Sequence, residues 1–274
     1  MKTSAIQARP AMAAGVGAGA GKRLWENSRH GLLAVASLLV FLLLWEAAVW
    51  LFKVKPIMLP PPSTVLRELA NEWHWYLGHA WYTLLTTLAG FALAVIGGVG
   101  LAVLLVSSRW FESAVYPLVI ALNSVPKVAI APLFVIWMGT GAEPKIAIAF
   151  LIAIFAVIVD TVHGLRSVPQ DVLDLGRVLK GSRLDFFVKV RLPSALPSIL
   201  TGMKVAISLA LIGAIVGEFV SSQRGLGYVI LSAQGTFDTP RVFAAIFVLV
   251  IMGIALFGLL AWLEKRATPW RQHD

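Results

Sequence analysis

The sequence contains no cysteine, which excludes disulfide bonds, thiolate metal sites and cysteine nucleophiles. Charged residues are also scarce, at 14% of the chain, whereas an ordinary soluble domain has about 25%. The five histidines form no HExxH motif, and no Ser/His/Asp or paired-carboxylate arrangement is visible, so we expect neither a catalytic centre nor a metal site. The Gly- and Ala-rich stretch ending at Lys22 is not a phosphate-binding loop, because Val16 replaces its first glycine and Arg23 replaces its Ser or Thr. Any ATP hydrolysis therefore belongs to a separate chain.

Apolar residues, by contrast, are abundant. They make up 58% of the sequence, and the mean hydropathy is +0.82. A membrane-spanning helix needs about 20 apolar residues, so a chain of 274 residues accommodates about six spans with their connections. We predict an all-α polytopic membrane protein with spans near residues 32–52, 82–106, 114–138, 146–163, 199–220 and 242–263.

Glycine and proline divide the apolar body. Pro60-Pro61-Pro62 exclude a span in the segment after residue 52, and we expect Ser63 to cap a short interfacial helix there. In the second span we expect small residues to let neighbouring helices approach closely, at Gly90, Gly97, Gly98 and Gly100. We expect three prolines to break the third span, namely Pro117, Pro126 and Pro132.

The longest polar interruption of the apolar body runs from residue 165 to residue 198. It holds six Lys and Arg against three Asp, and the positive-inside rule therefore places it in the cytoplasm. The formal charge of +9 follows the same rule, because 15 of the 23 Lys and Arg fall on segments expected to be cytoplasmic. The basic composition thus reflects membrane topology rather than nucleic-acid binding. Both termini are predicted to be cytoplasmic, with a disordered tail over 1–30, a transmembrane domain over 31–264 and a short tail over 265–274.

The interior of the 165–198 loop is itself patterned. Pro169 precedes apolar residues at helical spacing, which predicts a short amphipathic helix. Gly181 and Ser182 interrupt it, and Ser182 can cap a second helix with Asp185 three residues on. We expect two prolines to close the loop before the next span, Pro193 and Pro197. Two short amphipathic helices at the cytoplasmic face predict a docking surface for another protein.

These residues resemble the EAA loop of bacterial ABC-transporter permeases. That pattern begins with Glu-Ala-Ala and has Gly at the seventh place and Leu-Pro at places nineteen and twenty. When Asp174 is taken as the first place, the Leu-Pro pair falls on Leu192 and Pro193. Asp174-Leu175-Gly176 stands in place of Glu-Ala-Ala, and Gly181 comes one residue late. The segments LPPPSTV, NSVPKVAIAPLFVIWMGTGAEPK and GEFVSSQRGLGYVILSAQGTFDTPRVFAAI, in this order, are similar to the nitrate/sulfonate/taurine importer branch.

The resemblance implies the type I ABC importer permease fold, with its core at about 80–263, in the bacterial inner membrane. It further implies a second copy of this chain as a homodimer, two ABC ATPase subunits that bind ATP and Mg²⁺, and a periplasmic solute-binding protein. No cofactor is expected in this chain. The solute is expected to be a small anion such as a sulfonate, taurine or nitrate. The residues implied to couple the chain to its ATPase are Asp174, Leu175, Gly176, Arg177, Lys180, Gly181, Ser182, Arg183, Leu192 and Pro193.

A few polar residues within the predicted spans are candidates for the solute pathway. Charges inside a membrane are costly, and broken helices of the kind found at Pro126 line cavities rather than face lipid. Lys127, close to Asn123, is either a cation lining the pathway or the partner of Glu218 in an ion pair. Glu218 either holds the outer GLGY segment or acts as a gate. Asp160 and Lys204, near the ends of their spans, are expected to reach the membrane interface.

Two other functions compete with import powered by an ATPase. A self-contained secondary transporter could use Glu46, Asp160 and Glu218 as proton or cation sites, but it gives the patterned loop no role. A structural or signalling membrane protein could use the loop to bind a partner. Thr83 and its neighbours on the second span are expected to be hydroxyls that serve helix packing.

Overall fold

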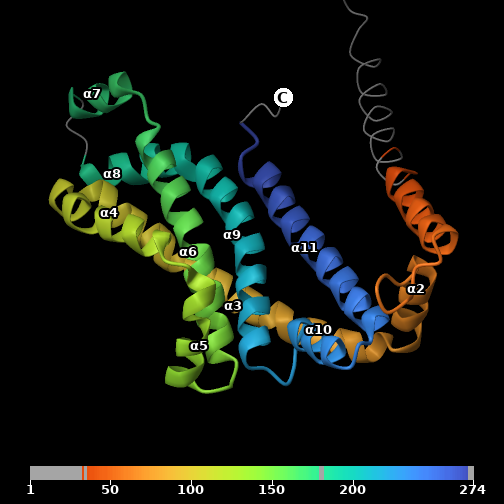
Figure 1. Ribbon diagram of the computed structural model, residues 1–274. Helices are drawn as coiled ribbons and strands as arrows, with labels where there is room; N and C mark the ends of the chain where they lie inside the picture. Colours follow the sequence, from red (N-terminus) through yellow and green to blue (C-terminus); the bar gives the residue numbers. More distant parts are fainter. Residues whose placement is uncertain (1–32, 34–35, 179–181, 271–274) are drawn as a thin grey trace, which may run out of the picture. The chain divides into compact units, whose positions relative to one another are not determined.

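The computed structural model describes residue 33 and residues 36–178 and 182–270, and every regular element in these parts is a helix (Figure 1). The predicted tail over 1–30 and the coupling residues Lys180 and Gly181 lie outside the described residues. The chain divides into two units, Met1–Ser63 and Thr64–Asp274, which are described separately.

The first unit contains the apolar helix Ala36–Leu51. Its Glu46 carboxylate accepts hydrogen bonds from Trp50 Nε1 at 2.9 Å, from Ser63 N at 3.0 Å and from Ser63 Oγ at 2.8 Å. The prediction that Ser63 caps the next helix is therefore wrong. Helix α2 (Pro62–Asn71) begins at Pro62, whose missing N–H costs nothing in a first turn, and the Ser63 hydroxyl is directed to Glu46 instead.

The second unit is a set of helices that follow one another through short connections. After α2 these are α3 (Trp73–Ser107), α4 (Arg109–Ser124), α5 (Lys127–Met138), α6 (Glu143–Arg166), α7 (Gln170–Val178), α8 (Arg183–Phe186), the π-helical turn η1 (Phe187–Arg191), α9 (Leu192–Val220), α10 (Leu226–Gly235) and α11 (Thr239–Ala267).

Four helices of the described chain are long and apolar enough to cross a membrane, namely α3, α6, the continuous helix Leu184–Val220 and α11. The pair α4 and α5, bent by 95°, makes a fifth if it is counted as one span. The all-helical polytopic fold is thus confirmed. The second span is longer than predicted, because α3 begins at Trp73 rather than near Tyr82.

The proline predictions had mixed outcomes. Pro126 does break the third span, at the bend between α4 and α5, whereas Pro117 and Pro132 lie inside those helices. Pro193 and Pro197 do not close the loop, because α8, η1 and α9 run on as one helix. At the π-turn the Leu192 N–H bonds to the Phe187 carbonyl, five residues back, so a widened turn comes directly before the prolines.

Small residues bring α6, α9 and α3 together along their lengths. A Cβ on Gly213 would lie 2.6 Å from the Ala149 Cα, and one on Gly202 would lie 2.7 Å from the Asp160 Cβ. On α3, the prediction of close approach is confirmed for Gly90, where a Cβ would lie 2.5 Å from that of Ala149, and likewise for Gly98. It is wrong for Gly100, which has no neighbour within 4 Å, while Gly97 makes only ordinary contacts. The backbones of these three helices therefore touch and form the core of the unit.

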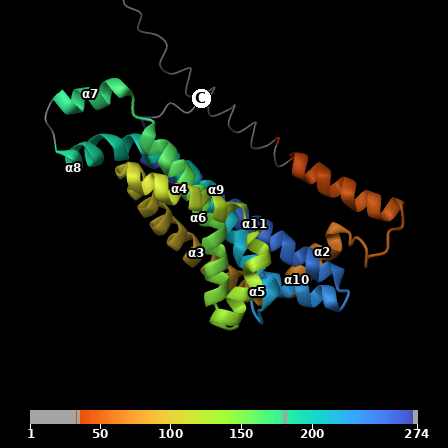
Figure 2. The same cartoon turned by 60° about the vertical axis from the view of Figure 1, so that its left-hand side comes forward.

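The helices of this second unit have two ends. One carries α7 and α8 and is called the loop end; the other carries α10 and is called the α10 end (Figure 1). In a second view, α7 and α8 again lie together beyond the ends of α6 and α9 (Figure 2).

Candidate functional site

The loop predicted to couple the chain to an ATPase begins where α6 ends. Ser167 Oγ donates to the Gly164 carbonyl at 2.8 Å and closes the last turn of α6. After Pro169, α7 starts at Gln170, as the sequence predicts. The predicted cap of the second helix is also confirmed: Ser182 Oγ accepts from the Asp185 N–H at 3.0 Å and donates to Asp185 Oδ2 at 2.6 Å. Lys189 then pairs with Asp185 at 2.7 Å, one turn further on.

Helix α7 leaves apolar side chains uncovered. Leu175 is 58% exposed and Val178 is 77% exposed, and with Val172 they recur every third residue on one face. Leu173 and Gly176 lie on the adjacent face, which is turned toward α8 and the membrane helices. The first face is available to a partner protein, and the second belongs to the chain's own structure.

The glycine that ends the Asp174-Leu175-Gly176 triplet makes a close contact. The Phe186 ring of α8 lies directly against Gly176, so any side chain there would displace the ring. This contact joins the two arms of the loop. It also gives a structural reason for a small residue at this place in the pattern.

The loop is joined firmly to the spans. Arg166, at the end of α6, forms an ion pair of 2.6 Å with Glu112 of α4. A Cβ on Gly164 would lie 2.7 Å from the Ser198 Cβ, so α6 and α9 are in contact where they leave the loop. Leu192, of the Leu-Pro pair, packs with Leu165 and neighbouring apolar residues. Both ends of the loop are therefore anchored to neighbouring helices.

The structure separates the three residues predicted for the pathway. Lys127 Nζ donates to Asn123 Oδ1 at 2.7 Å and to the Asn123 carbonyl at 3.2 Å, at the exposed bend between α4 and α5. Glu218 is almost fully buried and has other partners, so the ion pair between Lys127 and Glu218 is not formed. Asn123 and Lys127 thus form one polar site, and Glu218 belongs to another.

Glu218 holds the start of α10, which is one of the two roles that the sequence left open. Its carboxylate accepts from the Gly227 N–H at 2.7 Å and from the Thr83 hydroxyl at 2.8 Å. Thr83 Oγ1 accepts from the Leu226 N–H at 2.8 Å, and His79 Nδ1 accepts from the Gly225 N–H at 3.1 Å. Three side chains from α3 and α9 thus bind three successive N–H groups at the beginning of a helix, which otherwise lack partners. We call Glu218, Thr83 and His79 the α10 cap.

The α10 cap also depends on glycine. Gly225 has φ +102°, a conformation that other residues rarely adopt, and the Glu218 carboxyl lies against both Gly225 and Gly227. The packing role predicted for Thr83 was therefore incomplete. The spacing of His79 and Thr83, four residues apart on one helix face, was the available signal, but their partner lies far along the chain.

Lys145 follows Glu143 and Pro144 at the start of α6, and its side chain is fully buried. Its Nζ donates to the carbonyls of Thr140 and Gly141, each at 2.7 Å, and closes the turn before α6. Gly217, the residue before Glu218, packs against the Lys145 backbone and side chain. This burial could not be predicted from the sequence, because a lysine after Glu-Pro at the start of a helix is usually solvated.

Two other charged residues within the predicted spans, Lys204 and Asp160, lie at contacts between helices. Lys204 of α9 pairs with Glu264 of α11, and both side chains are largely buried. This ion pair links two spans, whereas the sequence predicted that Lys204 only reaches the membrane interface. Asp160 faces Gly202 across the contact between α6 and α9. Within the described residues no group of His, Cys, Asp or Glu is arranged to hold a metal ion.

A set of long apolar helices in close contact, with a patterned polar loop at one end, is the architecture of a polytopic membrane protein. The model of the family described as "Binding-protein-dependent transport system inner membrane component" matches residues 90–269. The chain belongs to this family.

Curated relatives agree. The formylaminopyrimidine transport permease protein ThiX of Halalkalibacterium halodurans is 35% identical over 90% of this chain and 99% of its own length. The riboflavin transport system permease protein RibX of Chloroflexus aurantiacus is 34% identical over 85% of this chain and 88% of its own. The taurine transport system permease protein TauC of Escherichia coli is 32% identical over 90% of this chain and 92% of its own length.

Solved structures agree on the fold. A chain from an inward-facing structure of the MetNI methionine ABC transporter superposes with a TM-score of 0.63 at 18% identity, covering 71% of this chain and 97% of that one. The type I importer permease fold is thereby confirmed, and the family model with the curated relatives confirms the predicted family.

Proposed function

We propose that this chain forms the membrane passage of an ATP-binding-cassette importer, working as a pair of copies with two separate ATPase subunits that hold ATP and Mg²⁺. The observation that carries the proposal is the uncovered apolar face of α7, on a loop that is joined to α6 and α9. An apolar face next to charged residues, at the end of membrane helices, fits a groove on a soluble partner. The basic residues of the loop favour a cytoplasmic position for the loop, and with it for both termini.

The contacts suggest how the coupling works. When the ATPase subunits close on ATP, they would move α7, and the contact between Gly176 and Phe186 would pass this motion to α8. Because α8 continues into α9 and the loop begins at α6, both helices would move as one body. The α10 cap, at the other end of α9, would carry the motion to α10.

Two solute classes are candidates. Small anions such as taurine, sulfonates or nitrate are favoured by the predicted family, and Lys127 at the exposed bend is a cation that could meet them. A heteroaromatic solute is favoured by two relatives of higher identity, which are named for formylaminopyrimidine and riboflavin transport. In this kind of importer a separate periplasmic protein would deliver the solute.

The coupling proposal is tested by Leu175→Asn, which makes the exposed face of α7 polar. The matched control is Leu66→Asn on α2, where the side chain is 52% exposed outside the loop. With the purified ATPase subunit in lipid vesicles, we expect Leu175→Asn to weaken assembly and solute-stimulated ATP hydrolysis about tenfold, since one well-packed apolar anchor contributes roughly 1.5 kcal/mol. We expect Leu66→Asn to leave both unchanged.

Charge reversal at Arg177 is expected to act in the same direction. Full assembly and transport in both loop variants would contradict the docking surface. Uptake by this chain alone, driven by a proton gradient without any ATPase, would instead establish a secondary transporter.

The solute class is decided by thermal-shift assays of the companion binding protein with taurine, an alkanesulfonate, nitrate, formylaminopyrimidine and riboflavin.

A further inference from the structure

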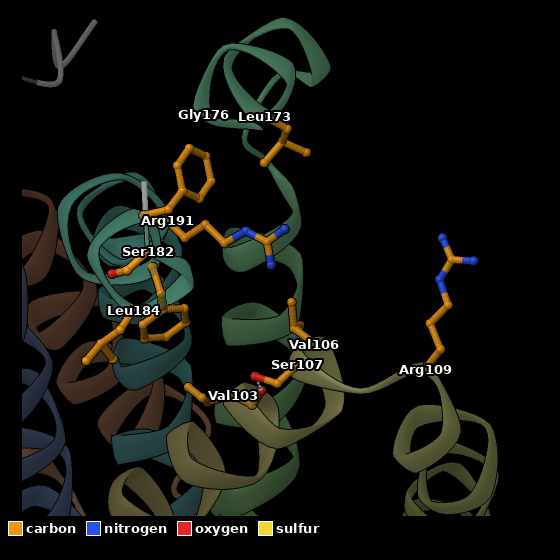
Figure 3. Close-up of a pocket in the computed structure, with 11 residues that line it drawn as sticks. Val103, Val106, Ser107, Arg109, Leu173, Gly176, Ser182, Leu184 and Arg191 are labelled. Carbon is orange, nitrogen blue, oxygen red and sulfur yellow. Dashed lines mark hydrogen bonds between the residues drawn. The ribbon is translucent and has the colours of Figure 1, made fainter. Parts of the chain in front are cut away.

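A cavity of about 980 Å³ lies at the loop end, beneath α7. Its walls come from the last turns of α3, the start of α4, the inner face of α7, and α8 with η1 (Figure 3). Its volume is at the upper end of the range found for binding sites of drug-sized molecules. The proposed function gives this space no role, because the docking face of α7 carries Leu175 and Val178, which do not line it.

The lining is divided by chemistry. One part is apolar, with Val103 and Val106 of α3 and the phenyl rings of Phe186 and Phe187. The other part is cationic, with Arg191 reaching into the space below α7 and Arg109 on its far side (Figure 3). No acidic side chain lines the cavity in the described part of the chain. A ligand that satisfies both parts must be an anion with an apolar portion.

Arg191 supplies a second observation. Its Nε is buried and has no hydrogen-bond partner among the described residues. A buried donor of a charged group that lacks an acceptor costs free energy, and an arginine binds phosphate oxygens through its paired N–H groups. The Ser107 hydroxyl, which also lines the cavity, donates to the Val103 carbonyl at 2.6 Å. The described lining thus holds two arginines and no carboxylate.

The position of the cavity selects the source of such an anion. Val103, Val106 and Ser107 end a helix that spans the membrane, so the cavity opens at the depth of the lipid headgroups. Basic segments beside the cytoplasmic ends of spans attract anionic lipids. A free phosphate would leave the apolar wall unused, whereas the glycerol and upper acyl chains of a lipid would cover it.

We propose that this cavity binds an anionic phospholipid of the leaflet on the loop side, with its phosphate on Arg191, its acyl chains along Val103, Val106 and Phe187, and Arg109 adding positive charge at the far side of the cavity. The lipid fills the space between α7 and the membrane helices. It therefore links the loop to the bilayer independently of any ATPase.

The test uses the purified full-length chain, stripped of lipid in mild detergent. Short-chain phosphatidylglycerol, phosphatidylcholine of the same chain length and inorganic phosphate are titrated, and bound molecules are counted by native mass spectrometry. The variant is Arg191→Gln. The matched control is Lys189→Gln, which removes the same charge from the same turn at a side chain that does not line the cavity.

We expect one phosphatidylglycerol to bind to each chain. Arg191→Gln should weaken its affinity about tenfold, which is the size expected for one charge-assisted hydrogen bond. Lys189→Gln should leave the affinity unchanged. Arg191→Lys should lie between, because it keeps the charge without the planar fork. Arg109→Gln is the second variant if Arg191→Gln does not fold, as judged by tryptophan fluorescence during unfolding.

Four results would overturn the proposal. Equal binding of phosphatidylglycerol and phosphatidylcholine would remove the anion preference, and equal losses in both variants would indicate bulk charge only. Complete displacement by millimolar inorganic phosphate would identify a site for free anions. Displacement of the lipid by an added ATPase subunit, together with weaker subunit binding in Arg191→Gln, would assign the cavity to a protein contact.

Discussion

The two ends of the helices in the second unit satisfy their polar groups in different ways. At the α10 end, the first N–H groups of α10 and the buried Lys145 amine all have partners within the chain. At the loop end, apolar side chains of α7 are exposed and the Arg191 Nε is buried without a partner in the described residues. A surface that is complete on its own needs nothing further to keep its shape. A surface that is incomplete indicates contacts supplied by other molecules, and we expect the two ends to respond differently to substitution.

The largest effect is expected at the α10 end, from Glu218→Ala. It removes the acceptor of the Gly227 N–H and of the Thr83 hydroxyl in a buried site, and leaving two buried donors unpaired costs about 3 kcal/mol. The free energy of unfolding in detergent, followed by tryptophan fluorescence, measures this loss. Glu218→Gln keeps one oxygen acceptor and should lose less.

The control for that substitution is Glu112→Ala at the loop end. Glu112 is partly exposed and pairs with Arg166, so its removal should cost at most about 1 kcal/mol. Equal losses for Glu218→Ala and Glu112→Ala would mean that the α10 end is not the self-contained one.

An intermediate effect is expected between the two ends, where α6 and α9 touch. Gly213→Ala places a methyl group 2.6 Å from the Ala149 Cα, so backbones must move apart at a cost of about 2 kcal/mol. The matched control is Gly258→Ala on α11, which has no neighbour within 4 Å and should stabilise the helix by up to about 1 kcal/mol. Unfolding in detergent compares the two. If both behave alike, α6 and α9 do not transmit motion as a rigid pair.

The smallest effect is expected from Ser182→Ala at the loop end. It removes the cap of α8 and should cost about 1 kcal/mol locally, without altering global unfolding. Hydrogen exchange of the amides over 183–187 measures the loss, and Ser182→Asn should restore protection because its side chain can also cap. Unchanged exchange in Ser182→Ala would show that tertiary contacts, rather than the cap, order this arm.

Local chemistry made the loop predictable. Pro169, Ser182 and Asp185 mark helix boundaries through contacts only a few residues apart, and the structure confirms them. The prolines at 193 and 197 misled the prediction, because a π-turn next to them lets the helix continue, and a π-turn has no simple sequence signature.

The α10 end was less predictable. Its contacts join residues that are far apart in the chain, such as Thr83 and Glu218, separated by 135 positions. A carboxylate near the end of a span is equally compatible with a gate, an ion pair or a cap. The choice among them depends on which helices are neighbours.

The sequence by itself determined that this chain is an all-helical membrane protein and where the polar loop begins, because hydropathy and capping act over a few turns of one helix. It overcounted the spans: six were predicted, whereas the described chain has four helices long and apolar enough to cross a membrane, or five with the bent pair. Only the tertiary structure decided which side chains meet: that Lys127 binds Asn123, that Glu218 holds α10, and that two arginines face a cavity under α7. Such contacts depend on how helices approach one another, and that approach is set by small residues on several helices at once.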